Sequence, residues 1–324
     1  LRPLTEAVHA EGAAAALQIG HAGYFASKRA SGQKVLGASK VFCTYTLTWP
    51  KVASVADLDR LTDDFERTTR LSAEAGFDAV ELHLGHGYLL SQFLSPYTNR
   101  RKDDYGGSLE NRLRLPLRVL ARVREALGPN KALLVKTNVE DGFKGGLSID
   151  EAAQVVTALK AGGADGVVLS GGFVSRTPFY MLRGELPVAE MVRNEKQAYR
   201  KLGLKLFGRV MVDEYAFQPL FFFDSAKVIR KAVSDFPLVL LGGIRNLDHL
   251  AQAEAAGFEF MSMGRPLIME PDLPRRMEQG EVRASRCEPC NKCVGEMENG
   301  GIRCAHPELG KLSSSRWPFG EKGP

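Results

Sequence analysis

The chain has 324 residues, of which 44% are hydrophobic and 25% are charged. These fractions are typical of a folded globular protein and exclude a disordered chain, a collagen and a disulfide miniprotein. The 43 Lys and Arg residues exceed the 38 Asp and Glu residues by 43 − 38 = 5, with both signs mixed along the chain. This mild excess permits an anionic ligand such as a phosphate and does not indicate a nucleic-acid partner.

The sequence favours a protein of a reducing compartment. No segment has the pattern of a secretory signal, and no run of about 18 apolar residues could span a membrane. Four of the five cysteines lie between Cys287 and Cys304, which favours a metal or cluster site over a disulfide framework. Cys43 is alone and is expected to be a buried or loop thiol. We expect a cytoplasmic protein without a membrane partner, and the oligomeric state is open, a homo-oligomer included.

Short apolar runs alternate with helical patterns along most of the chain. This alternation predicts a parallel sheet with right-handed crossovers. Helices are expected where Leu58, Leu61 and Phe65 recur, from a capping box at Ser148 to Lys160, and over Asn246–Ala256. The predicted strands are Ala14–Ile19, Ala79–His83, Ala132–Asn138, Gly166–Ser170, Leu238–Leu241 and Phe258–Met263.

The best architecture is a (β/α) barrel of the TIM type. Only six βα units can be counted, whereas a closed barrel needs eight, so either two units are missing or the sheet is open. The long, aromatic-rich segment Phe173–Asp235 is expected to hold extra helices or a lid. The final stretch, Pro307–Pro324, is rich in Ser, Gly and Pro and is expected to be a loose tail.

Polar residues interrupt three of the predicted strands near their C-terminal ends. Gln18 stands between Leu17 and Ile19, Glu81 and His83 alternate with apolar neighbours, and Lys136 shares a strand face with Asn138. Each could be a satisfied polar core residue, but three together favour an active site, which barrels carry at this end.

The motif His83-x-x-His86-x-Tyr88 follows the second predicted strand. Two imidazoles and a phenol could bind zinc, yet no further ligand follows at a metal spacing. Two donors that polarise a carbonyl, with a phenol as proton donor, suit the motif better.

Glycines end the last two predicted strands, and an arginine follows the second of them. Glycine lets backbone N–H groups approach a phosphate, and arginine adds a charged fork. Plain turn glycines are the alternative to a phosphate site built by Gly242, Gly243, Gly264 and Arg265.

The chain resembles the old yellow enzyme family, the NADH:flavin oxidoreductases, over about residues 1 to 304. The stretch AGFDAVELHLGHGYLLSQFLSPYTNRRKDDYGGSLENR (75–112) is long and highly specific for the family, whereas Phe173–Asp235 is only loosely similar. Further matching stretches are LTEAVHAEGAAAALQIGHAG (4–23), VKTNVEDG (135–142), LSGG (169–172), LGGI (241–244) and MSMGRPLIMEPDL (261–273).

The resemblance implies a (β/α)8 barrel that binds FMN at its C-terminal mouth and takes hydride from NAD(P)H. Gln18 would bond the flavin pyrimidine edge, and Lys136 would stabilise negative charge near flavin N1 and O2. The phosphate would be held by the four residues Gly242, Gly243, Gly264 and Arg265.

The substrate side of the resemblance is an activated alkene. His83 and His86 match the pair that binds the carbonyl oxygen of the substrate, and Tyr88 matches the proton donor. The leading expectation is therefore an FMN-dependent ene-reductase of α,β-unsaturated carbonyl compounds. An inactive ligand-binding barrel is one alternative.

The chain departs from the family at two places. Tyr24 stands where the family often has arginine after the HAG stretch. Family members also carry two βα units before the stretch that matches Leu4. These units are absent here and the first residue is Leu1, so we expect an N-terminally incomplete form of the enzyme.

The motif Cys287-x2-Cys290-x2-Cys293-x10-Cys304 suits a [4Fe–4S] cluster, a four-cysteine zinc site or unligated thiols. Its spacing resembles that of the iron–sulfur flavoenzymes of this family, trimethylamine dehydrogenase and dienoyl-CoA reductase. An iron–sulfur flavoprotein of that type is therefore a second alternative. The expected division is an FMN-binding partial barrel over residues 1–280 and a cysteine-bearing extension over residues 281–324.

Overall fold

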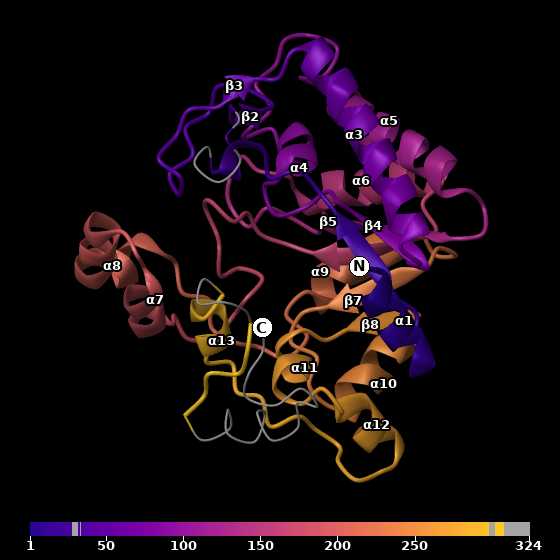
Figure 1. Ribbon diagram of the computed structural model, residues 1–324, viewed down its shortest axis with the longest axis vertical. Helices are drawn as coiled ribbons and strands as arrows, with labels where there is room; N and C mark the ends of the chain where they lie inside the picture. The colour runs from indigo at the N-terminus through magenta and orange to yellow at the C-terminus, as the bar shows by residue number, and fades with distance from the viewer. Residues whose placement is uncertain (28–31, 33, 298–301, 308–324) are drawn as a thin grey trace. The chain divides into compact units, whose positions relative to one another are not determined.

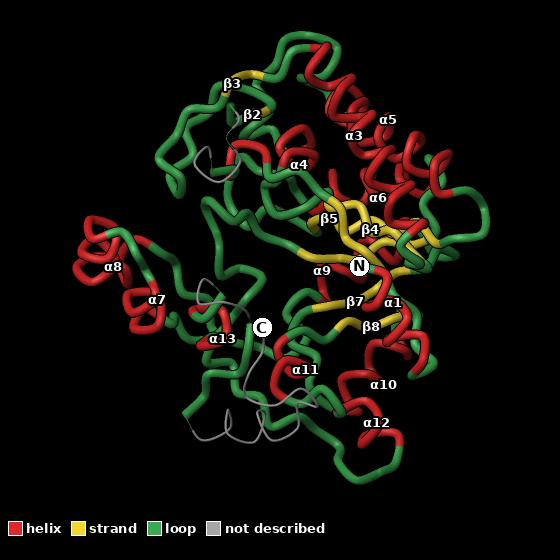
Figure 2. The backbone as a smooth tube through the Cα atoms, in the orientation of Figure 1, coloured by secondary structure: helices red, strands yellow, loops and turns green. Residues whose placement is uncertain are grey.

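The computed structural model describes residues 1–27, 32, 34–297 and 302–307. The chain forms two compact units, which are Leu1–Thr177 with Asp224–Leu240 and Pro178–Phe223 with Leu241–Pro324. Figure 1 labels the elements, and Figure 2 colours them by secondary structure. These units are the parts of the chain that pack most densely within themselves. The expected boundary at residue 280 instead separates an FMN-binding part from a cysteine-bearing part, and it stays a prediction.

The first unit has an α/β fold with a parallel sheet (Figure 2). Its strands lie in the order β1-β4-β5-β6-β7, and each pairs in parallel with the next. The strands of this sheet are β1 (Ala16–Ile19), β4 (Ala79–His83), β5 (Ala132–Asn138), β6 (Gly166–Ser170) and β7 (Leu238–Leu241). A separate small parallel pair, β2 (Leu36–Gly37) and β3 (Lys51–Val52), comes between β1 and β4 in the sequence. The helices are α1 (Arg2–Ala10), η1 (Gly23–Phe25), α3 (Val55–Glu74), α4 (Leu89–Leu94), α5 (Leu109–Leu127), α6 (Ile149–Ala161) and α9 (Phe223–Ala232).

The sequence placed these strands correctly because each is a short apolar run bounded by turn residues. In β5 and β6 the side chains of Leu133, Val135, Val167 and Leu169 are fully buried. The pair β2–β3 was not predicted, since two-residue strands carry no periodic pattern. The count of βα units in the complete barrel stays a prediction.

The helices that cover the sheet begin and end where their capping residues predict. Ser54 and Asp57 form a reciprocal capping box at the start of α3, and Gly76 follows its end at a φ of +91°. The Ser148 side chain accepts a hydrogen bond from the backbone of Glu151 at the start of α6, as expected. Helices α3 and α5 lie side by side (Figure 1).

The second unit holds most of the segment Phe173–Asp235 and the cysteine motif. Its elements are α7 (Val188–Asn194), α8 (Ala198–Met211), α10 (Leu247–Ala255), β8 (Phe260–Ser262), α11 (Arg265–Met269), α12 (Leu273–Glu278) and α13 (Lys292–Gly295). The long segment therefore contains extra helices, as expected, and a function as a lid stays a prediction.

Helices α7 and α8 pack against each other, and α13 contacts α7 (Figure 1). The Asn194 side chain donates a hydrogen bond of 2.7 Å to the Gly295 carbonyl, and Arg193 pairs with the buried carboxylate of Glu296. The insertion thus fixes the chain that follows the third cysteine of the motif.

The expected tail over residues 307–324 lies outside the described residues apart from Pro307. Among the described helices, none combines the length and the apolar character that a membrane span requires.

Candidate active site

The first unit brings polar side chains from four neighbouring strands to one face of its sheet. The register pairs Gln18 with Glu81, His83 with Lys136 and Asn138 with Ser170. Paired residues share a face, as do residues two apart along a strand, so all six side chains lie on the same side. The polar groups therefore share one face near the ends of their strands, as the patterns predicted, and their role in an active site stays a prediction. Ser170 was missed because a serine that ends an apolar strand carries no signal of its own.

The turn that carries His86 is held in an uncommon backbone conformation. His86 has a φ of +61° and Gly87 a φ of +77°. Asn138 at the end of β5 accepts the backbone N–H of His86 at 3.0 Å and donates to Gly172 O at 2.8 Å. The Gln92 side chain of α4 donates to Gly87 O at 2.7 Å. Such left-handed residues persist where their surroundings over-determine them, often at functional sites.

The two imidazoles form one hydrogen-bonded chain. The Gly85 N–H donates to His83 Nδ1 at 3.3 Å, His83 Nε2 lies 3.0 Å from His86 Nδ1, and His86 Nε2 lies 2.7 Å from Ser170 Oγ. Since His83 Nδ1 accepts, its proton is on Nε2 and is donated to His86 Nδ1. His86 then carries its proton on Nε2 and donates it to Ser170.

Both imidazoles are neutral at pH 7. Burial, with the positive charge of Lys136 as a smaller cause, lowers the pKa of His83 to about 4. Burial also lowers the pKa of His86 well below its usual value, and His83 and Lys136 add to this effect. Neutral imidazoles can donate hydrogen bonds to an oxygen without transferring a proton to it.

Tyr88 caps the start of α4, and its ring lies 4.8 Å from the His83 ring between centroids. Burial raises the pKa of its phenol, so the hydroxyl keeps its proton at neutral pH. The motif His83-x-x-His86-x-Tyr88 therefore places two imidazoles and a protonated phenol together, as the sequence predicted. Among the described residues no third His, Cys, Asp or Glu joins the two imidazoles in a metal-binding arrangement, and the preference for a carbonyl oxygen over zinc at this motif stays a prediction.

Gln18 and Lys136 meet at a residue to which the sequence assigned no function. Gln18 Nε2 and Lys136 Nζ both donate to Oε1 of Glu81, at 2.5 and 2.8 Å. An amide and an ammonium group fit the carbonyl and nitrogen acceptors of a flavin pyrimidine edge, so this donor set is compatible with FMN.

Tyr24, which stands where the family often has arginine, is a buried core residue. Its ring packs edge-on against Phe173, with centroids 6.3 Å apart, and its hydroxyl pairs with Ser175 Oγ. Cys43 is fully buried in the same hydrophobic cluster, as expected of a structural thiol.

The predicted phosphate residues all belong to the second unit. Gly242 and Gly243 have φ values of +107° and +78°, and a Cβ on Gly243 would lie 2.8 Å from Gln218 O and Leu220 N. The segment 218–220 comes so close that packing alone requires a glycine at this position. A role of these glycines at a phosphate therefore stays a prediction. Arg265 begins α11 directly after Gly264.

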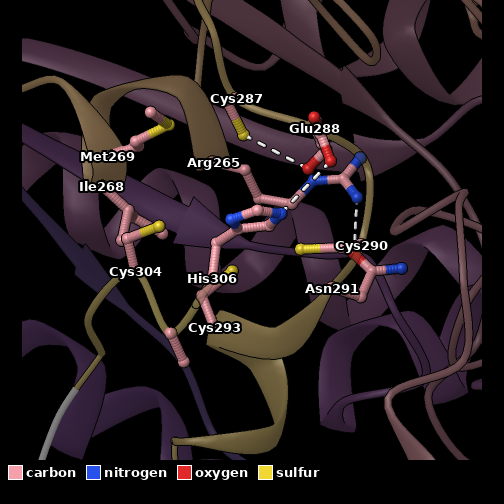
Figure 3. Close-up of a pocket in the computed structure, with 11 residues that line it drawn as sticks. Arg265, Ile268, Met269, Cys287, Glu288, Cys290, Asn291, Cys293, Cys304 and His306 are labelled. Atoms are coloured by element: carbon pink, nitrogen blue, oxygen red, sulfur yellow. Dashed lines mark hydrogen bonds and ion pairs between the residues drawn. The ribbon is translucent and has the colours of Figure 1, made fainter. Parts of the chain in front are cut away.

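Arg265 and the four motif cysteines line one small pocket in the second unit (Figure 3). The guanidinium donates to Arg183 O at 3.0 Å and to Asn291 Oδ1. Asn291 lies between Cys290 and Cys293 in the sequence. It is buried and has a φ of +54°. The sequence could not show that the side chain of Arg265 lies at the cysteines.

The cysteines are free thiols in this arrangement. Burial raises the pKa of Cys287 to about 12, against the opposing effect of Arg265, and it also raises the pKa values of Cys293 and Cys304. Four thiols in one pocket are the donor set of an iron–sulfur cluster or a structural zinc. Their positions within the described residues do not amount to a closed metal site, and metal binding stays a prediction.

Comparison with known proteins shows the family to which the chain belongs. The model of the NADH:flavin oxidoreductase / NADH oxidase family matches residues 1–174. The chain is 42% identical over 305 residues to 4,4'-dithiodibutanoate disulfide reductase of Rhodococcus erythropolis, covering 94% of this chain and 75% of that protein. It is 30% identical over 315 residues to NADH oxidase of Thermoanaerobacter brockii, covering 95% of this chain and 44% of that protein.

The fold is shared with a solved structure of the old yellow enzyme homologue of Zymomonas mobilis. The TM-score is 0.64 at 24% identity, over 95% of this chain and 76% of that one. The chain thus spans three quarters of the Rhodococcus relative and less than half of the Thermoanaerobacter relative. From the family match and the 42% identity, the chain belongs to the NADH:flavin oxidoreductase / NADH oxidase family, a family of oxidoreductases.

Proposed function

We propose that the protein is an FMN-dependent ene-reductase. The reaction adds hydride to the β-carbon and a proton to the α-carbon of an α,β-unsaturated carbonyl compound, while NAD(P)H becomes NAD(P)⁺. The single observation that carries the proposal is the pair of neutral imidazoles, His83 and His86, beside the protonated phenol of Tyr88. The imidazoles can donate hydrogen bonds to a carbonyl oxygen that gains negative charge. The phenol can donate a proton to the α-carbon.

Bound FMN supplies the hydride chemistry, because it accepts hydride from NAD(P)H and passes it on. Gln18 and Lys136 would bind its pyrimidine edge, and the resemblance assigns its phosphate to Gly242, Gly243, Gly264 and Arg265. The lysine ammonium would stabilise negative charge on the reduced cofactor.

The substrate oxygen would bind at the imidazole pair. Because His83 donates to His86 and His86 donates to Ser170, an incoming oxygen takes over one of these N–H donors. The imidazole that donates keeps one hydrogen bond, whereas the displaced acceptor, His86 Nδ1 or Ser170 Oγ, loses its partner. An unpaired buried group costs about 1–3 kcal/mol, which binding of the substrate has to offset. Tyr88 would then donate its proton to the α-carbon.

A disulfide substrate is the first competitor. The relative from Rhodococcus erythropolis is named for the reduction of 4,4'-dithiodibutanoate, and it matches 94% of this chain. Reduction of the S–S bond develops no negative charge on an oxygen that the imidazole pair could stabilise, since no carbonyl is attached to that bond, and this favours the enone. Both compounds therefore belong in the test.

An iron–sulfur flavoprotein is the second candidate, because four cysteines line one pocket with Arg265. An iron–sulfur cluster would supply one-electron transfer, and Cys287, Cys290, Cys293 and Cys304 would hold it. Iron and acid-labile sulfide are measured after anaerobic purification, and zinc is measured in the same sample. About four iron atoms per chain support this candidate, and zinc alone excludes it.

The central test is anaerobic turnover by protein purified with FMN. NADH and NADPH are each supplied with 2-cyclohexen-1-one or with 4,4'-dithiodibutanoate, and the products are identified by mass. Cyclohexanone as the product supports the proposal. Reduction of the disulfide alone contradicts it, and a protein that binds FMN but reduces neither compound supports the inactive-barrel alternative.

A further inference from the structure

Glu81 is a carboxylate on the active face to which the proposed function gives no task. Its side chain is 12% exposed, and that of its partner Lys136 is 21% exposed. The residue stands on β4 between the edge strand β1 and the strand β5. It lies two residues before His83, so both side chains point to the same side of the sheet.

One oxygen of Glu81 binds both groups that would bind the flavin. Gln18 Nε2 donates to Oε1 at 2.5 Å, and Lys136 Nζ donates to the same atom at 2.8 Å. A carboxylate this far from water is costly unless it is paired, and Lys136 is its pair. Removal of Glu81 would therefore release the amide of Gln18 and leave the ammonium of Lys136 without a counter-charge.

We propose that Glu81 is a positioning residue that orients Gln18 and Lys136 and sets the net charge at the flavin pyrimidine edge. This inference rests on the proposed function. A lone lysine would stabilise the extra negative charge of the reduced cofactor, whereas the Lys136–Glu81 pair is close to neutral and stabilises it less. Glu81 thus keeps the bound cofactor a stronger hydride donor than Lys136 alone would allow.

The test is the two-electron midpoint potential of bound FMN, measured by anaerobic dye equilibration on the full chain. Glu81→Gln should raise the potential by at least about 30 mV, which is tenfold in the equilibrium of a two-electron couple. The double variant Glu81→Gln with Lys136→Gln should return toward the wild-type value. Glu110→Gln is the matched control, because it removes an exposed carboxylate that is 3.7 Å from Arg114, and its potential should not move.

Each outcome decides the matter. An unchanged or lowered potential in Glu81→Gln with FMN still bound overturns the inference. If Glu81→Gln folds but loses FMN while Glu81→Asp keeps it, the positioning role is supported. A Glu81→Gln chain that does not fold makes the residue structural and overturns the inference. A wild-type chain that binds no FMN refutes the proposed function instead, which is a separate result.

Discussion

Replacement of Gly87 by alanine tests whether the turn at the candidate active site is held by close packing. Gly87 has a φ of +77°, and an added Cβ would lie 2.4, 2.6 and 2.8 Å from three ring atoms of Phe173. A left-handed backbone costs a non-glycine residue about 1–2 kcal/mol, and overpacking a core costs about 1–3 kcal/mol. We expect Gly87→Ala to destabilise the chain by about 2–5 kcal/mol as the sum of these two costs.

Gly12 offers a matched control, since its φ is +75° and nothing lies within 4 Å of an added Cβ. Gly12→Ala should cost about 1–2 kcal/mol, the backbone part alone. Urea unfolding of both variants, followed by circular dichroism, measures the difference as a shift of the midpoint. Gly87→Ala should also slow enone reduction at least about tenfold, since it would displace the neighbouring His86. A rise of about 1.4 kcal/mol in the activation free energy is enough for that factor. Equal midpoints and equal rates in the two variants would refute the steric reasoning.

The remaining predictions concern the phenol, the imidazoles and the cysteines. Tyr88→Phe should slow enone reduction by about 10²–10⁴-fold, the usual contribution of a general acid, while flavin reduction by NAD(P)H stays rapid in stopped-flow traces; equal losses in both half-reactions would make Tyr88 structural, and the exposed Tyr199→Phe is the control. The pKa of His83 is about 4 in the folded chain and about 6.5 in the unfolded chain. Above pH 6.5 both states are neutral, and as the pH falls toward 4 only the unfolded state gains this proton. The free energy of unfolding should therefore fall by about 3 kcal/mol over that window, and His83→Gln should lose this dependence; a variant with the wild-type slope argues that other groups cause it. Cys290→Ala should lower the metal content per chain, whereas Cys43→Ala should not, by elemental analysis; equal metal in both variants would place the metal elsewhere.

The sequence alone determined most of the sheet and the identity of the polar groups on it. Strand periodicity is a local signal that a single sequence carries, because residues two apart along a strand share a face. For that reason Gln18, His83 and Lys136 were correctly expected on one side of neighbouring strands. The motif around His86 and Tyr88 was specific enough to indicate the family, which the comparisons then showed.

The tertiary structure decided which of these groups touch each other. Whether Glu81 meets Lys136 or water depends on the register between β4 and β5, and a single strand does not encode that register. The same holds for the tautomers of His83 and His86, which follow from a backbone N–H at one end and Ser170 at the other. Local pattern fixes the face of a side chain, and only packing across strands fixes its partner and its charge.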